Sequence, residues 1–160
     1  NKKLGGGVIL TQIHEIDYFL HLFSDYKIIN ATYVSSKVSD LDIDVEDVFS
    51  SNFLLKKNKS KMFCNINLNY FERPKKRKFC LIGNNGTLVA CFNTQKISIT
   101  KNGKKKILTF NFKKNDIFIK EVKFFISRVK SKKLISNDLN LYNGIKTLRF
   151  ALKLKNNYLD

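Results

Sequence analysis

Apolar residues near the start of the chain recur at the spacing of a helix. Between residues 8 and 23 they lie four, three, four and three positions apart, so they share one face of an α-helix. The sequence therefore predicts an amphipathic helix over residues 8–23 that buries this apolar stripe. The stripe consists of Ile9, Ile13, Ile16, Leu20 and Phe23.

The middle of the chain has the composition of strands. Residues 28–34 and 48–56 are rich in β-branched and aromatic side chains, and an acidic segment at 40–47 lies between them. Residues 62–71 alternate apolar with asparagine side chains, which is the period of a strand with one buried face. We expect a strand in each apolar range and a loop leading into a strand in the acidic segment.

Two short polar segments carry the residues of tight hairpin turns. Residues 84–86 (Asn-Asn-Gly) and 101–104 (Lys-Asn-Gly-Lys) each separate two strand-like runs within residues 78–112. Asparagine and glycine tolerate the positive φ angles that such turns require. The sequence therefore predicts an antiparallel meander in this part of the chain.

Helical spacing returns in the last third of the chain. Apolar residues recur every three or four positions over residues 118–129 and 142–152, and Ser-Asn-Asp at 136–138 supplies capping residues before the final helix. The order is one helix, six or seven strands and two helices. This order predicts the α+β class, with an open, mainly antiparallel sheet and helices packed on one face. The uncovered face of such a sheet predicts a homo-oligomer that forms through it.

Length and composition are those of one globular domain over residues 1–160. A chain of this size buries roughly two-thirds of its unfolded surface, and it has no apolar run approaching the roughly 20 residues of a membrane span. The cysteines, Cys64, Cys80 and Cys91, are odd in number and lack a C-x-x-C pair, which favours a reducing, cytoplasmic setting. His14 and His21 have no suitable ligands near them in the sequence, so we expect no metal site.

The net charge of +17 raises nucleic acid or another polyanion as a partner. Lysine greatly outnumbers arginine, although base readout favours bidentate arginine. The lysine clusters also lie in predicted turns and helix ends, so a solvated surface is the favoured interpretation and a non-catalytic basic binding module is the alternative. The clusters lie at 56–59, 75–78, 104–106 and 130–133.

The predicted first helix also has a polar stripe opposite its apolar one. It contains Thr11, His14, Asp17, Tyr18 and His21. An imidazole can transfer protons near neutral pH, and a hydroxyl or carboxylate one turn away can orient its ring. Periodicity alone favours an ordinary solvated helix face, and a proton-transfer site is the alternative.

Three segments, in the same order, resemble the second domain of the Gfo/Idh/MocA oxidoreductases, the family of glucose-fructose oxidoreductase and inositol dehydrogenase. Residues 5–23 (GGGVILTQIHEIDYFLHLF) resemble the segment that opens that domain. Residues 77–88 (RKFCLIGNNGTL) are similar to its R-x-x-x-I-x-G-x-x-G-T-L hairpin, and residues 137–152 are similar to its closing helix. The resemblance spans nearly the whole chain.

The resemblance implies an NAD(P)-dependent enzyme that oxidises a hydroxyl of a sugar or nucleotide sugar. It implies that His14 is the catalytic group, transferring a proton or orienting the substrate, and that Thr11, Asp17, Gly6 and Gly7 are candidate substrate-binding residues. Many members carry an aspartate three or four positions before this histidine. Here Thr11 and Leu10 occupy those positions, so the usual carboxylate partner is absent, and threonine supplies no negative charge.

The chain lacks the part of such an enzyme that would hold the cofactor. No G-x-G-x-x-G turn for a dinucleotide is present, and the family's Glu-Lys-Pro segment has no counterpart. We therefore expect the 160 residues to be the C-terminal part of a longer enzyme, whose N-terminal Rossmann domain binds NAD or NADP. The isolated chain should be inactive and bind no cofactor. The glycine run at 5–7 is either a close-packed or flexible entry to the helix or a substrate contact.

Overall fold

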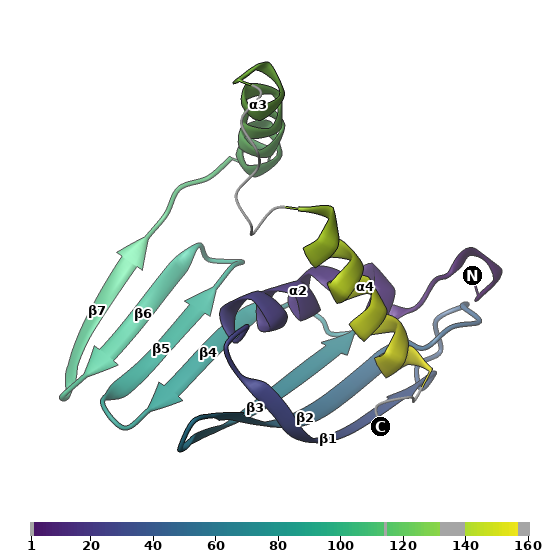
Figure 1. Ribbon diagram of the computed structural model, residues 1–160, viewed down its shortest axis with the longest axis horizontal. Helices are drawn as coiled ribbons and strands as arrows, with labels where there is room; N and C mark the ends of the chain where they lie inside the picture. The colour runs from purple at the N-terminus through teal and green to yellow at the C-terminus, as the bar shows by residue number, and fades with distance from the viewer. Residues whose placement is uncertain (1, 114, 132–139, 157–160) are drawn as a thin grey trace. The chain divides into compact units, whose positions relative to one another are not determined.

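The chain divides into two compact units. The computed structural model describes residues 2–113, 115–131 and 140–156 (Figure 1). The first unit comprises Asn1–Phe71 and Ile135–Asp160, and the second comprises Glu72–Leu134. The single domain predicted over residues 1–160 stays a prediction, and each unit is described by itself.

The first unit opens with a 3-10 turn, Lys2–Leu4, followed by α1 (Val8–Thr11) and α2 (Ile13–Leu22). The helix predicted over residues 8–23 is present, but it is interrupted at Gln12, which has φ −105° and ψ 29°. The predicted apolar stripe is confirmed, because its members are buried or packed against the core.

A three-stranded antiparallel sheet lies under these helices. Its strands are β1 (Lys27–Ser36), β2 (Val48–Lys57) and β3 (Ser60–Asn69), in the order β1-β2-β3. The alternation predicted for residues 62–71 is confirmed over β3, where the apolar side chains are more buried than the asparagines. The asparagines join a hydrogen-bonded row with β2 on the other face, in which Asn65 Nδ2 lies 2.8 Å from Asn52 Oδ1.

The final helix, α4 (Leu141–Lys155), completes the core of the first unit by packing against α1 and α2 (Figure 1). The Asn140 side chain caps it by accepting a hydrogen bond from the Asn143 N–H at 2.8 Å. The capping residues predicted at 136–138 lie outside the described residues. The buried apolar cluster consists of Val8, Ile9, Ile16, Phe19, Phe49, Phe53, Leu55, Leu68, Ala151 and Leu154.

The second unit contains the predicted meander. Its strands pair in the order β4-β5-β6-β7, and both predicted hairpins are present. The second turn has positive φ at Asn102 (49°) and Gly103 (71°), as expected. In the first turn the positive φ falls on Gly86 (152°) and not on the asparagines. The strands are β4 (Lys78–Gly83), β5 (Gly86–Cys91), β6 (Lys96–Lys101) and β7 (Lys104–Thr109).

The second unit has no buried residue among those that the structure describes. Its helix, α3 (Asp116–Ser131), also has none, although one face of it is apolar. A sheet usually needs one covered face to be stable. The described apolar side chains of this unit are at most partly buried, so they lack the burial that stabilises a sheet. Those more than half exposed are Ile82, Ile107, Ile117, Phe118, Val122, Phe125 and Val129.

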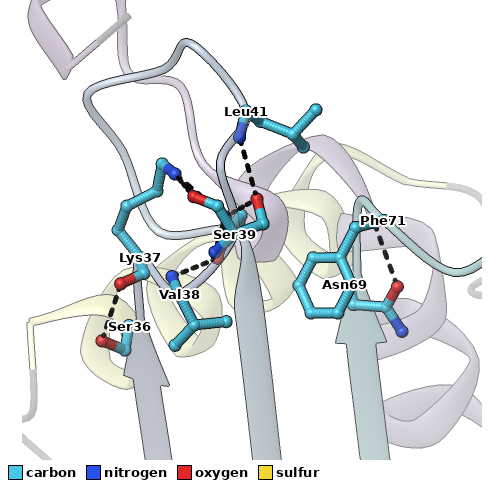
Figure 2. A network of polar contacts seen from close by, with 8 residues as sticks. Ser36, Lys37, Val38, Ser39, Leu41, Asn69 and Phe71 are labelled. Carbon is cyan, nitrogen blue, oxygen red and sulfur yellow. Dashed lines mark hydrogen bonds and ion pairs between the residues drawn. The ribbon is translucent and has the colours of Figure 1, made fainter.

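The predicted α+β class, with antiparallel strands and helices on one face, is confirmed. The strands form two sheets, however, and not one. Between β3 and β4, two backbone N–H groups donate to side chains: Phe71 N to Asn69 Oδ1 at 3.2 Å (Figure 2), and Arg77 N to Asn93 Oδ1 at 2.8 Å. Among the described residues no helix is both long and apolar enough to cross a membrane.

Candidate functional site

His14 lies in the first turn of α2, with its side chain 51% exposed. Its Nε2 is 3.0 Å from Oε1 of Glu15, so the imidazole has an acidic neighbour after all. This pairing was not predicted, because adjacent residues on a helix seldom face each other. A carboxylate in this position can orient the ring by accepting a hydrogen bond from it.

Thr11 is held from two sides by hydrogen bonds inside the first unit. Its Oγ1 donates to the carbonyl of Gly7 at 2.8 Å and accepts from Oη of Tyr70 at 2.6 Å. The single hydroxyl proton of Thr11 is therefore committed to Gly7, and Thr11 can offer a ligand only a lone pair while this bond persists. Tyr70, which lies directly after β3, was not predicted as a site residue.

Asp17 joins α2 to α4. Its Oδ1 accepts a hydrogen bond from the hydroxyl of Thr147 at 2.7 Å, and Thr147 is buried. One oxygen of this candidate substrate-binding carboxylate is therefore used in helix packing. His21 lies in the last turn of α2, with an exposed side chain. The predicted polar stripe thus contains an imidazole near each end and a packing contact between them.

The glycine run forms a close-packed entry to α1. Gly7 is buried at φ 123°, and a Cβ there would lie 2.0 Å from Oε1 of Glu46. The N–H of Val8 donates to the Glu46 carbonyl at 3.0 Å. Nζ of Lys155 donates to the Gly6 carbonyl and lies 3.7 Å from the Glu46 carboxylate. Of the two interpretations of the run, these contacts support close packing at Gly7.

A buried carboxylate organises the connection between β1 and β2. Asp47 is fully buried, and it accepts hydrogen bonds from the N–H groups of Val38 (2.8 Å) and Ser39 (3.0 Å) and from the Ser39 hydroxyl. Figure 2 shows this turn, in which Leu41 N also donates to Ser39 Oγ at 3.3 Å. The residues predicted as a loop at 40–47 therefore form a structured connection.

Opposing effects set the pKa of Asp47. Burial would raise it, but the hydrogen bonds from Ser39 and Val38 and the charge of Lys37 outweigh burial and lower the pKa to about 2. Nζ of Lys37 lies 3.5 Å from Oδ2 of Asp47. Asp47 is therefore ionised at neutral pH and acts as a structural anion, and not as a proton donor.

Other kinds of site find little support in the described part of the chain. No group of three or more His, Cys, Asp or Glu side chains is placed to hold a metal ion among the residues described. Cys64, Cys80 and Cys91 are free thiols. A hollow of about 350 Å³ follows the β4–β5 hairpin, but no predicted site residue lines it.

Comparisons with known proteins extend the picture of the fold. No family model matches the sequence, and a search of curated proteins finds no match. Among solved structures, the UDP-N-acetylglucosamine 3-dehydrogenase GnnA from Acidithiobacillus ferrooxidans matches 96% of this chain and 48% of its own, with a TM-score of 0.75 and 16% identity.

Two further solved structures are similar. A candidate oxidoreductase from Thermotoga maritima matches 92% of this chain and 43% of its own, with a TM-score of 0.68 and 18% identity. Biliverdin reductase from Synechocystis sp. PCC 6803, in complex with biliverdin and NADP+, matches 91% of this chain and 45% of its own, with a TM-score of 0.64 and 13% identity. At these identities the likeness shows the fold alone. The chain spans about half the length of these structures, and it shares the fold of that part of them.

Proposed function

We propose that this chain is the substrate-binding and oligomerisation part of an NAD(P)-dependent oxidoreductase that acts on a hydroxyl of a sugar or nucleotide sugar. The observation that carries the proposal is the His14–Glu15 pair, at 3.0 Å, with His14 exposed on α2 of a fold shared with such oxidoreductases. GnnA is by its name a UDP-sugar dehydrogenase, so a nucleotide sugar is the first substrate class to test. The free thiols are consistent with a reducing, cytoplasmic setting.

The chemistry assigned to this chain is proton transfer. Oxidation of a secondary alcohol releases the hydroxyl proton, and His14 is the group that accepts it. Glu15 contributes by holding the ring and stabilising the positive charge that His14 gains. NAD or NADP, when bound in the complete enzyme, would supply the hydride acceptor.

Among the described residues, the glycine entry to α1 does not fit a dinucleotide. A pyrophosphate needs free backbone N–H groups at a helix N-terminus, but Val8 N donates to Glu46 at the start of α1. The Glu46 carboxylate also occupies the space beside Gly7 and would repel a phosphate. NAD or NADP therefore belongs to a Rossmann domain outside these 160 residues.

A second copy of the chain is the proposed partner of its exposed sheet. Among described residues the second unit buries no side chain, and β7 is exposed along its whole length. Apolar side chains such as Ile82 (82% exposed) would gain burial in a homo-oligomer. This supports oligomerisation through a sheet face of this unit.

The decisive experiment replaces one histidine at a time in the full-length enzyme, with UDP-N-acetylglucosamine as the first substrate. We expect His14→Ala to lower kcat by about 10²–10⁴-fold, the usual contribution of a positioned proton-transfer group. His21→Ala is the matched control, because it removes an exposed imidazole from the same helix, and it should retain wild-type turnover. Wild-type turnover in His14→Ala would show that His14 has no catalytic role.

The alternative function, a basic module that binds a polyanion, has one supporting observation. Lys27, Lys56 and Lys61 lie directly opposite one another across β1, β2 and β3, an arrangement that like charges disfavour. A bound anion would relieve the repulsion. For binding of this kind, the logarithm of the affinity should fall steeply and linearly with the logarithm of the salt concentration. If the chain binds no polyanion at low salt, the alternative function is excluded.

A further inference from the structure

We infer that Tyr70 is a positioning residue for His14. The inference rests on the proposed function, since it assigns Tyr70 to the site that His14 defines. Tyr70 lies directly after β3 and is far from His14 in the sequence, but its phenol reaches the break between α1 and α2.

The first evidence is a chain of hydrogen bonds with one direction. Oη of Tyr70 donates to Oγ1 of Thr11 at 2.6 Å, and Oγ1 of Thr11 donates to the Gly7 carbonyl at 2.8 Å. Each hydroxyl that donates becomes a better acceptor, so the two bonds strengthen each other. Together they fix the last residue of α1 against both the glycine entry and the end of β3.

The second evidence is that β3 holds the helix break at a neighbouring point. Nε2 of Gln12, the residue between the helices, donates to the Asn69 carbonyl at 3.0 Å. The backbone of Tyr70 is itself anchored, because its N–H donates to the Asp47 carbonyl at 3.1 Å. Asn69 and Tyr70, at the end of β3, therefore hold Gln12 and Thr11 at the helix break.

The direction of α2 at its start depends on these contacts. A threonine hydroxyl that donates back to the carbonyl four residues earlier loosens the regular helix, and Gln12 leaves helical geometry at this point. His14 is the second residue of α2, so a change at Gln12 moves its imidazole directly. Displacing a catalytic group by about 1 Å can lower the rate about 10²-fold. We therefore expect the Tyr70–Thr11 hydrogen bond to affect turnover more than substrate affinity.

The test is a double-mutant cycle in the full-length enzyme. Tyr70→Phe removes the donor of the 2.6 Å hydrogen bond, and Thr11→Val removes its acceptor together with the Thr11–Gly7 bond. We expect each variant to lower kcat about tenfold or more with KM changed less than twofold, and the double variant to be no worse than either single variant. Tyr142→Phe is the matched control, because Tyr142 is 74% exposed on α4, and it should match the wild type.

The outcomes separate this inference from the proposed function. If His14→Ala keeps full turnover, the proposed function is wrong. If His14→Ala loses turnover but Tyr70→Phe and Thr11→Val match the wild type, the positioning role alone is wrong. Losses that multiply in the double variant, or that appear in KM and not in kcat, also overturn it. Should Tyr70→Phe fail to fold, Thr11→Val is compared with Thr11→Ser, which keeps the hydroxyl that accepts from Tyr70, and equal kcat in these two variants would overturn the positioning role.

Discussion

Gly7 is the residue whose identity the local structure demands most directly. It is buried with φ at 123°, a region that side chains other than glycine rarely adopt, and the position of its missing Cβ is 2.0 Å from Oε1 of Glu46. That carboxylate is in turn paired with Lys155 on α4. The glycine therefore lets the start of the chain, the segment before β2 and the end of the last helix meet in one place.

Gly7→Ala should destabilise the protein by roughly 2 kcal/mol or more, because it adds backbone strain to a collision with Glu46. Thermal unfolding of the variant measures the loss. Gly144→Ala is the control: Gly144 lies in α4 with nothing near its Cβ position, and alanine there should stabilise the helix by about 0.5–1 kcal/mol. Equal melting temperatures for Gly7→Ala and wild type would contradict the assignment of Gly7 to close packing.

The sequence could supply candidates at the residue scale but not their contacts. His14 and Thr11 were predicted from a helical stripe and a resemblance. Glu15 was missed because helical geometry separates adjacent side chains, whereas here the two side chains meet at 3.0 Å. Tyr70 was missed because its partner Thr11 is distant in the chain, and no periodicity reports a single long-range hydrogen bond.

At the scale of elements, the connection between β1 and β2 shows how one buried carboxylate replaces regular structure. The turn after β1 directs two backbone N–H groups and a hydroxyl at Asp47, so these donors are satisfied without a strand partner. The carbonyl of Asp47 accepts the N–H of Tyr70. Asp47 thus ties this connection to the end of β3, next to the helix break.

Asp47→Asn should lower the melting temperature at pH 7 by several degrees. The asparagine amide would place an N–H donor opposite the N–H and O–H donors that the carboxylate now accepts from. The pKa of Asp47 is lowered from 3.8 to about 2, so the stability that ionisation supplies is complete above pH 3.8 and is lost as pH falls towards 2. The difference in melting temperature between wild type and variant should therefore shrink between pH 4 and 2.

Asp25→Asn is the control for that pH series. Asp25 is an exposed carboxylate whose pKa the Lys57 ammonium lowers, through a hydrogen bond and ion pair of 2.8 Å. Surface pairs of this kind contribute little to stability, so the control should melt close to the wild type across the series. A difference for Asp47→Asn that stays constant from pH 7 to pH 2 would show that ionisation of Asp47 does not stabilise the fold.

The elements themselves were largely predictable, and their interruptions were not. The stripe over residues 8–23, the alternation over 62–71 and both hairpin turns follow from local periodicity and turn chemistry. The helix break at Gln12 does not, because it depends on the Gln12–Asn69 contact, which brings together distant parts of the chain. Local patterns fix where elements form, whereas long-range polar contacts fix where they bend.

At the scale of the whole molecule, burial is unevenly distributed. All the buried residues that the structure describes belong to the first unit, which combines α1, α2 and α4 with one sheet face. The division of the strands into two sheets was not predictable, because both sheets have the same antiparallel pattern along the sequence. The exposed apolar side chains of the second unit are the observation on which the proposed homo-oligomer rests.

The 160-residue chain alone should bind neither NADH nor NADPH. Its glycine run leads into a helix of only 4 residues, whose first N–H donates to Glu46 and whose entrance the Glu46 carboxylate fills. A pyrophosphate there would meet negative charge in place of free donors.

A fluorescence titration with NADH checks this prediction. The titration must include a salt series, because a net charge of +17 attracts any dinucleotide weakly. Weak binding that disappears at about 0.5 M salt fits screened surface attraction. Saturable binding that resists salt would mean that these residues build a cofactor site of their own. The full-length enzyme is the positive control, and it should bind the cofactor at low and at high salt.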